Sequence, residues 1–226
     1  MTKIRAFIFD LDGVIVDTAK YHYIAWKHLA KQLGFDFTPE HNEKLKGVSR
    51  MESLNILLSI GGIALPNDQK DKLAAQKNAL YVSYIKKMTP SEILPGVLHF
   101  LGEIKKTGIK SAIGSASKNT PLILKQLNIE KFFDAVVDGN SVTHAKPNPE
   151  VFLQGAQLLG VNASECLVFE DAIAGIEAAG NAKMHCIGIG DYKILNNARV
   201  VIPGFQSFSL QKLNDLIPDL EIKGIK

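Results

Sequence analysis

The stretch Phe7-Ile8-Phe9-Asp10-Leu11-Asp12-Gly13 decides the fold of this chain. Residues 3–10 are predicted to form a buried strand, which ends at two aspartates spaced one residue apart. In parallel α/β sheets, ligands bind outside the carboxyl ends of the strands, so Asp10 and Asp12 are well placed for chemistry. Side chains at positions i and i+2 can face one side of an extended chain, so one acid could attack while the other moves a proton. An edge strand that runs into an acidic turn would show the same residues.

The composition indicates a globular protein with a sizeable core, because 46% of the 226 residues are hydrophobic and 22% are charged. The net charge of +3 is dispersed along the chain, so we expect no nucleic-acid partner. No apolar run approaches the roughly 18 residues of a membrane span, and the first strand begins too early for a signal peptide. We therefore expect a cytoplasmic monomer with no membrane partner, in which Cys166 and Cys186 are buried free thiols.

After the first strand, the apolar spacing becomes that of helices. Three helical stretches are predicted, at about 17–34, 49–60 and 68–87. Beyond Pro95-Gly96 the chain alternates between short apolar runs and helical patterns. Strands are predicted at 109–114, 134–137, 166–169 and 185–189, and helices at 97–107, 120–128, 149–160 and 172–180.

This order predicts an α/β fold with a doubly wound parallel sheet and helices on both of its faces. The helical stretch interrupts the alternation, so we expect a small cap domain that is inserted after the first strand. The predicted domains are a core of residues 1–16 and 89–226 and a cap of residues 17–88. The two crossings, near 14–17 and 88–95, would then serve as hinges.

Polar residues follow other predicted strands as well. The run Ser115-Ala116-Ser117-Lys118-Asn119 offers hydroxyls and backbone N–H groups at a helix N-terminus, which suit either a phosphate or an ordinary helix cap. Lys146 precedes the next helix, where it is either a solvated charge or a cation that neutralises a transferring phosphoryl group. The pair Glu170-Asp171 could bind Mg²⁺ together with the first two aspartates, or it could merely complement a helix dipole.

The predicted cap contains three candidate substrate contacts. The loop Lys46-Gly47-Val48-Ser49-Arg50 carries two cations and a flexible glycine, which suits it to grip a second anionic group. Lys77 lies on the apolar stripe of its helix, so its ammonium either extends to the surface or reaches into the cleft. His22 opens the first cap helix near the aspartates, where it is either structural or bonds the general acid or a sugar.

Asp10 and Asp12, Ser115, Lys146 and the Glu170-Asp171 pair occur in the order of the four motifs of the haloacid dehalogenase superfamily. The chain resembles that superfamily of phosphotransferases, which implies a Rossmann-like core and a covalent mechanism. In this mechanism Asp10 attacks phosphorus and forms an aspartyl-phosphate, while Asp12 acts as general acid and base. The resemblance also implies that Ser115 and Lys146 hold the phosphoryl oxygens. Mg²⁺ would be bound by Asp10, the Asp12 carbonyl, Glu170 and Asp171.

A narrower set of residues resembles the bacterial β-phosphoglucomutases within that superfamily. The set comprises Asp10–Ile15, Asp17–Ala19, Tyr21-His22, Ala25–Lys27, Leu45–Arg50, Ser115–Asn119, Lys146-Pro147 and Glu170-Asp171. The resemblance runs from residue 4 to about residue 190 and includes the cap. It implies interconversion of β-D-glucose 1-phosphate and β-D-glucose 6-phosphate through β-D-glucose 1,6-bisphosphate, with Arg50, Ser117 and Asn119 on the phosphate that is not transferred. That family often has Ser after the Glu-Asp pair, whereas this chain has Ala172, which we expect to tune the metal site and not to disable it.

Two other functions stay open at this point. A phosphatase that hydrolyses small sugar phosphates would use the same core residues, but it would need no second phosphate grip in the cap. A silent sugar-phosphate binder is disfavoured because both Asp10 and Asp12 are present. For the mutase, we expect substrate contacts from His22, Lys46, Gly47, Val48, Arg50 and Lys77 in the cap and from Ala116, Ser117, Lys118 and Asn119 in the core.

Overall fold

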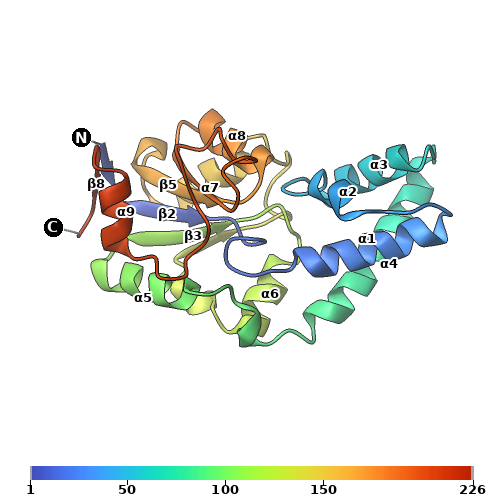
Figure 1. The fold of residues 1–226 in the computed structure, drawn as a ribbon, viewed down its shortest axis with the longest axis horizontal. Helices are drawn as coiled ribbons and strands as arrows, with labels where there is room; N and C mark the ends of the chain where they lie inside the picture. The colour runs from blue at the N-terminus through green and yellow to red at the C-terminus, as the bar shows by residue number, and fades with distance from the viewer. Residues whose placement is uncertain (1, 225–226) are drawn as a thin grey trace.

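The computed structural model describes residues 2–224, and it consists of a layered α/β core with a helical cap at one end (Figure 1). The main sheet has six parallel strands in the order β4-β3-β2-β5-β6-β7, which confirms the predicted fold class. The strands are β2 (Ala6–Phe9), β3 (Lys110–Gly114), β4 (Ala135–Val137), β5 (Cys166–Glu170), β6 (His185–Ile189) and β7 (Val200–Ile202). Because β2 lies between β3 and β5, the chain positions that follow these three strands meet at one edge of the sheet.

Helices cover both faces of this sheet (Figure 1). One face is covered by α5 (Val97–Thr107), α6 (Thr120–Leu127) and α9 (Leu210–Leu216), and the other by α7 (Glu150–Leu159) and α8 (Ile173–Asn181). Short 3₁₀ helices complete the described part of the core: η1 (Pro90–Glu92), η2 (Glu130–Phe132) and η3 (Ala163–Glu165). No helix within residues 2–224 combines the length and the apolar character that crossing a bilayer would require.

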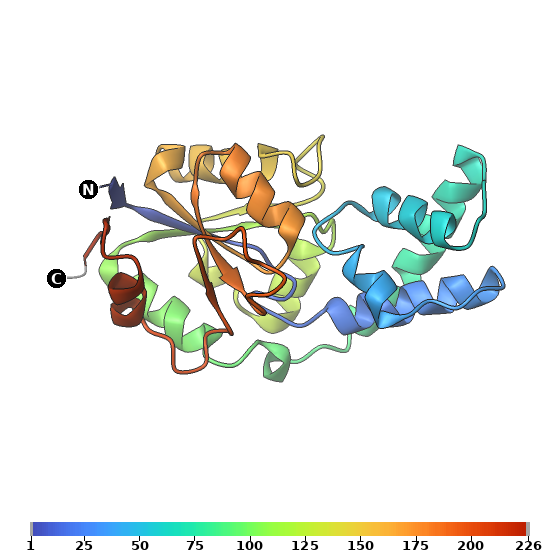
Figure 2. The same ribbon diagram turned by 45° about the horizontal axis from the view of Figure 1, so that its top comes forward.

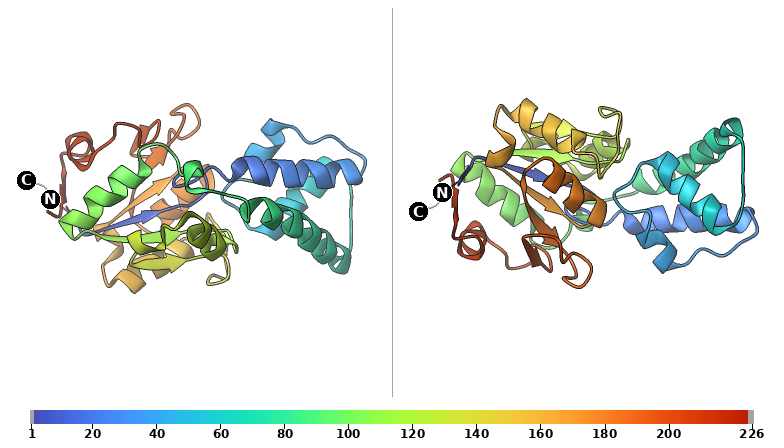
Figure 3. Two further views of the ribbon diagram at one scale, coloured as in Figure 1. Left: turned by 90° about the horizontal axis from the view of Figure 1, so that it is seen from below. Right: turned by 90° about the horizontal axis from the view of Figure 1, so that it is seen from above.

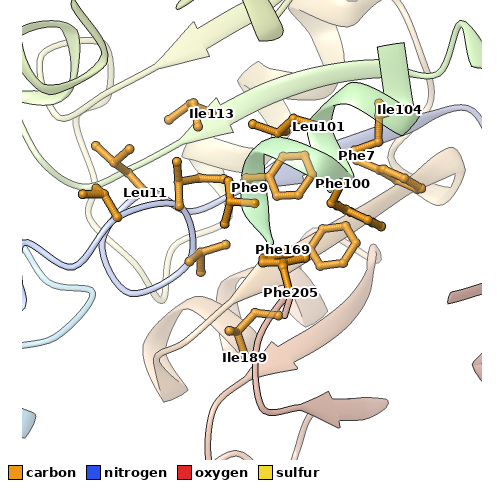
Figure 4. Close-up of a cluster of buried hydrophobic side chains, with 14 of the residues drawn as sticks. Phe7, Phe9, Leu11, Phe100, Leu101, Ile104, Ile113, Phe169, Ile189 and Phe205 are labelled. Atoms are coloured by element: carbon orange, nitrogen blue, oxygen red, sulfur yellow. The ribbon is translucent and has the colours of Figure 1, made fainter. Parts of the chain in front are cut away.

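The alternation of side chains along β2 explains how the two faces are filled. Phe7 and Phe9 belong to the apolar cluster beneath α5, α6 and α9, whereas Ala6 and Ile8 belong to the cluster beneath α7 and α8. The ring of Phe9 stacks on that of Phe169 from β5, with 4.8 Å between the centroids (Figure 4). Aromatic side chains therefore lock the strand that precedes Asp10 to its neighbour.

The predicted strand at 3–10 is wrong in one respect, because it divides at Arg5. The first part, β1 (Thr2–Ile4), pairs with β8 (Leu220–Ile222) in a separate two-stranded sheet, and β2 alone joins the main sheet. The segments near the two ends of the chain thus lie side by side, away from the cap (Figure 2). Apolar spacing could not predict this division, since the partner strand lies at the other end of the sequence.

The inserted helices are α1 (Ala19–Gln32), α2 (Pro39–Glu43), α3 (Arg50–Ile60) and α4 (Asn67–Ile85). Their own apolar cluster contains Trp26, Leu29 and Leu54, among others. The short helix α2 was not predicted; Thr38 caps it, since its hydroxyl accepts a hydrogen bond from the backbone N–H of His41. The insert is helical as predicted, while the boundaries proposed at 16/17 and 88/89 stay predictions.

The two crossings between core and cap run side by side. The backbone N–H of Leu94 donates to the carbonyl of Ile15 at 3.0 Å, and Val16 forms a β-bridge with Ile93. Figure 3 shows the narrow neck that these segments form. At the cap side, Tyr81 and Ile85 of α4 pack into the core cluster, so the base of the cap rests on the core.

Replacing Phe169 by Ala should lower the free energy of unfolding by about 3–5 kcal/mol, because a fully buried aromatic ring is lost from a cluster that cannot collapse around the cavity. Equilibrium urea unfolding measures this loss. Leu158→Ala is the control, because Leu158 is 63% exposed and its truncation should change stability by no more than about 0.5 kcal/mol. Similar losses in the two variants would contradict the packing described above.

Candidate active site

The turn after β2 presents Asp10 and Asp12 at the edge of the sheet. The backbone N–H of Asp10 still bonds to the carbonyl of Phe169 at 2.9 Å, and the chain then turns at Gly13, where φ is +84°. A side chain at Gly13 would collide with the carboxylate of Asp171 as well as strain this φ. Glycine is therefore required here because the two acidic pairs approach each other closely.

A buried lysine lies behind Asp10. The Lys146 ammonium donates hydrogen bonds to Asp10 Oδ1 at 2.6 Å and to Glu170 Oε2 at 2.8 Å, and all three residues are buried. Burial alone would favour the neutral amine, but the two carboxylates outweigh it, so the pKa of Lys146 is raised. Lys146 thus orients the Asp10 carboxylate; it does not line the cavity described below.

Three carboxylates are placed to bind a metal ion. Oxygen atoms of Asp10, Glu170 and Asp171 all lie within 4.8 Å of one another. Burial, followed by the charge of Asp10 (partly offset by Lys146 at Glu170), raises the pKa of Asp171 to about 7 and that of Glu170 to about 8. A cluster that carries this excess of buried negative charge, and only oxygen donors, fits a hard divalent cation such as Mg²⁺. The carboxylate of Asp12 is not part of this group. That the backbone carbonyl of Asp12 binds the metal ion stays a prediction.

Asp12 lies outside the cluster of Asp10, Glu170 and Asp171. Burial, followed by the charge of Asp10, raises the pKa of Asp12 to about 8. Within residues 2–224, no hydrogen-bond donor reaches its buried Oδ1 atom. Burial thus favours the protonated form of this carboxyl group, so Asp12 can take up and release a proton, and its free oxygen can bond to a ligand. These are the properties of a general acid.

The loop after β3 forms a nest of hydroxyls and backbone N–H groups. Ser115 Oγ accepts a hydrogen bond from the backbone N–H of Ser117 at 3.1 Å, and Ser117 Oγ accepts one from that of Asn119 at 3.2 Å. The Ser115 hydroxyl hydrogen remains available to an incoming oxygen. Helix α6 starts directly afterwards, with Asn119 at its N-cap, so its dipole adds to the attraction for an anion.

The cap contributes a buried pair of basic groups. The Lys77 ammonium lies 2.8 Å from His22 Nδ1 and sits over the ring of Trp26, 4.3 Å from its centroid. Burial and the nearby charge of Lys77 hold the pKa of His22 well below its usual value, so His22 is neutral and Nδ1 can accept this bond. Of the two possibilities for Lys77, the structure favours the cleft, because its side chain is buried in the cavity.

The loop that precedes α3 contacts the core next to Asp171 and Ala172. Lys46 pairs with Glu43 at 3.0 Å and approaches Asp171 at 3.9 Å. A Cβ atom at Gly47, where φ is +74°, would come within 3.2 Å of the Ala172 side chain. The Arg50 side chain, at the first turn of α3, faces the cavity and is half-buried.

A cavity of about 500 Å³ lies between the cap and the core and unites these parts. Every predicted substrate contact lines it, together with Asp10, Asp12, Ser115 and Asp171; Lys146 and Glu170 lie beneath its wall. Sequence reasoning assigned no role to several other residues that line the cavity, among them Trp26, Asn42, Ser53, Asp71 and Thr143. Two signals pointed to Trp26: it is the single tryptophan of the chain, and it lies in the run Ala25–Lys27 that resembles the mutase family.

Comparison with known proteins identifies the family of this site. Residues 7–189 match the sequence profile of the haloacid dehalogenase-like hydrolases. The chain belongs to this family. The predicted superfamily is therefore confirmed, and the aspartates, Ser115, Lys146 and the Glu170-Asp171 pair lie within the matched range.

Several proteins of named activity are similar to this chain over most of its length. A β-phosphoglucomutase of Bacillus subtilis is 41% identical, over 93% of this chain and 94% of its own length. A phosphorylated carbohydrates phosphatase of Thermotoga maritima is 32% identical, over 88% of this chain and 90% of its own length. The crystal structure of a β-phosphoglucomutase from Clostridium difficile superposes with a TM-score of 0.91 at 41% identity, covering 96% of this chain and 98% of that one. The relatives thus comprise both mutases and sugar-phosphate phosphatases.

Asp171→Asn should weaken Mg²⁺ binding at least about tenfold, because it removes one charged oxygen donor from a site with few protein ligands. Isothermal titration calorimetry of the unphosphorylated protein measures this affinity without any turnover. Asp191→Asn is the matched control, because Asp191 is an exposed carboxylate at the end of the neighbouring strand β6. Equal affinities in the two variants would show that the cation binds elsewhere.

The segment that leads to Lys146 is held by Glu150, in the first turn of α7. The Glu150 carboxylate accepts hydrogen bonds from the backbone N–H groups of Thr143 at 3.0 Å and His144 at 2.8 Å. These bonds lower the pKa of Glu150 from 4.5 to about 2.

A depressed pKa in the folded state means that Glu150 stabilises the protein above its unfolded-state pKa of 4.5 and ceases to do so as the pH falls to about 2. Glu150→Gln should therefore be less stable than the parent protein at pH 7, and the difference should shrink across this acidic range. Urea unfolding at a series of pH values measures the difference. Glu177→Gln, which changes an exposed residue on α8, is the control and should show no such pH dependence. If the stability difference between Glu150→Gln and the parent protein did not change with pH, the role given to the Glu150 carboxylate would be wrong.

Proposed function

We propose that this chain is a β-phosphoglucomutase that interconverts β-D-glucose 1-phosphate and β-D-glucose 6-phosphate through β-D-glucose 1,6-bisphosphate. The observation that carries the proposal is the two-ended cavity. Asp10, Asp12 and Ser115 lie at the core end, and the basic side chains of Lys77 and Arg50 enter from the cap. A substrate that carries a phosphate at each end would match both poles, and the similarity to mutases at 41% identity extends over the cap as well as the core.

The proposed cycle consists of two phosphoryl transfers. In the first, the 6-hydroxyl of glucose 1-phosphate gives its proton to Asp12 while its oxygen attacks the aspartyl-phosphate, and the bond to Asp10 breaks. The bisphosphate then binds in the opposite orientation. In the second transfer, an oxygen of Asp10 attacks the phosphorus at C1, the bond from phosphorus to the sugar oxygen breaks, and Asp12 returns the proton to that oxygen.

Each residue of the site would have a distinct part in these transfers. Lys146 orients the Asp10 carboxylate through the 2.6 Å hydrogen bond, and Ser115 donates to an oxygen of the transferring group. Mg²⁺, held by Asp10, Glu170, Asp171 and the carbonyl of Asp12, would supply charge neutralisation at the phosphoryl group when bound. The neutral His22 and its partner Lys77 would contact the sugar and the Asp12 carboxyl. The bisphosphate would also serve as the activator that phosphorylates Asp10 at the start.

A phosphatase that acts on small sugar phosphates is the second candidate. The relative from Thermotoga maritima supports it, because that protein aligns with 88% of this chain and is a phosphatase. The same aspartyl-phosphate would form, and water would then take the place of the sugar hydroxyl. The two functions differ in whether the cap excludes water and holds the second phosphate.

The deciding experiment mixes the protein with β-glucose 1-phosphate, Mg²⁺ and a trace of bisphosphate, and measures glucose 6-phosphate and free phosphate together. A mutase should form glucose 6-phosphate with little release of phosphate. Stoichiometric phosphate with little isomerisation would assign the chain to the phosphatases instead.

Arg50→Ala should lower mutase turnover by about 10- to 100-fold, since a charged hydrogen bond to a phosphate contributes roughly 1.5–3 kcal/mol. Phosphorylation of Asp10 by acetyl phosphate, which has no second anionic group, should be spared. The control is Arg199→Ala, because Arg199 pairs with Asp219 away from the cavity. Equal loss of both activities in Arg50→Ala would refute the role given to Arg50.

A further inference from the structure

Asn119 occupies the N-cap position of α6, yet its side chain does not cap the helix. Asparagine is among the strongest N-cap residues because its side-chain oxygen accepts a hydrogen bond from the first turn, and this bond contributes about 1 kcal/mol. Here no such bond forms. The Asn119 amide instead turns towards the cap, where its Nδ2 atom donates to Asn78 Oδ1 at 2.9 Å.

This hydrogen bond connects two parts of the proposed site. Asn78 lies on cap helix α4, directly after Lys77, and Asn119 ends the predicted phosphate-binding loop of the core. Both asparagines are half-buried. The cap also meets the core where Lys46 approaches Asp171, at 3.9 Å. Of these two contacts, the one made by Asn78 involves the predicted phosphate-binding loop.

The geometry points to Asn78 as a positioning residue for the phosphate that is not being transferred, an inference that rests on the proposed function. We infer that Asn78 fixes the carboxamide of Asn119. An amide presents an oxygen at one end and N–H groups at the other, and only the N–H end attracts a phosphate. Because one N–H of Asn119 is donated to Asn78, the amide is held with its second N–H free for the anion.

The same bond couples cap closure to phosphate binding. When the cap moves away, Asn119 loses its partner on α4, and its side chain is free to rotate into the usual N-cap position. In that position its oxygen bonds to the start of α6, and its N–H groups no longer face Asn78. When the helical insert closes, Asn119 thus gives up its hydrogen bond to the start of α6 and bonds to Asn78 instead. This exchange orients the Asn119 N–H group towards the ligand.

The test uses the fluorescence of Trp26, the single tryptophan of the chain, which lines the cavity. Titration of the unphosphorylated protein with glucose 6-phosphate gives a Kd for the parent protein, Asn78→Ala, Asn119→Ala and the double variant. Asn78→Ala should raise the Kd about three- to tenfold, as expected for one hydrogen bond. The double variant should bind no more weakly than Asn119→Ala alone, because Asn78 acts through Asn119.

Gln76→Ala is the matched control. Gln76 lies two residues before Asn78 on the same helix and forms an amide–amide hydrogen bond of the same length, 2.9 Å, but its partner Gln32 belongs to the cap. This variant should leave the Kd unchanged. Phosphorylation of Asp10 by acetyl phosphate should be the same in Asn78→Ala and the parent protein, whereas a general disturbance of the fold would slow it.

Three results would overturn the inference: a parent-like Kd for Asn78→Ala, additive losses in the double variant, or an equal loss in Gln76→Ala. The proposed function fails on a different observation, namely a parent protein that binds glucose 6-phosphate but does not isomerise glucose 1-phosphate. In that case the four Kd values still decide whether Asn78 positions Asn119. A parent protein that gives no saturable change with glucose 6-phosphate would contradict both proposals.

Discussion

The buried ammonium of Lys146 is the interaction on which the rest of the site depends. It lies between Asp10 and Glu170, which come from two adjacent strands, and it is the cation that allows both carboxylates to be buried. An ion pair in this position costs desolvation energy and adds little net stability, so its value lies in fixing positions. It aims one oxygen of Asp10 by a bond that is independent of the cap. The core alone therefore orients Asp10, the proposed nucleophile.

The remaining negative charge divides the site into chemically distinct parts. One lysine cannot balance Asp10, Asp12, Glu170 and Asp171, and burial together with this excess of negative charge raises the pKa values of the last three. A divalent cation would offset the excess at the cluster of three carboxylates, which does not include Asp12. The fold thus places two aspartates that are separated by one residue in different surroundings, as the proposed roles of nucleophile for Asp10 and acid for Asp12 require.

Much of this arrangement could be predicted from sequence because it depends on local patterns. Apolar runs that end in polar residues placed Asp10, Ser115 and Glu170 at one sheet edge, and spacing identified the helical insert. The division of the first strand at Arg5 depended on β8, a partner distant in sequence. The hydrogen bond from Asn119 to Asn78 could not be predicted from sequence either. From sequence alone, Asn119 is expected to be an ordinary helix N-cap and Asn78 a polar residue on a helix surface. Patterns along the chain predict elements and their ends, but they do not show which side chains meet across a cavity.

The paired crossings at the neck have a consequence for how such a molecule can change. Because Ile15 and Leu94 are hydrogen-bonded to each other, the helical insert leaves and re-enters the core at nearly the same point. An insertion whose ends coincide can be lengthened, shortened or exchanged without moving any strand of the sheet. Under the proposed function, the residues for phosphoryl transfer and most of the cap contacts to the substrate then belong to separable pieces of one chain. Replacing the insert could change those contacts while the strand ends that carry Asp10 and Glu170 stay in place.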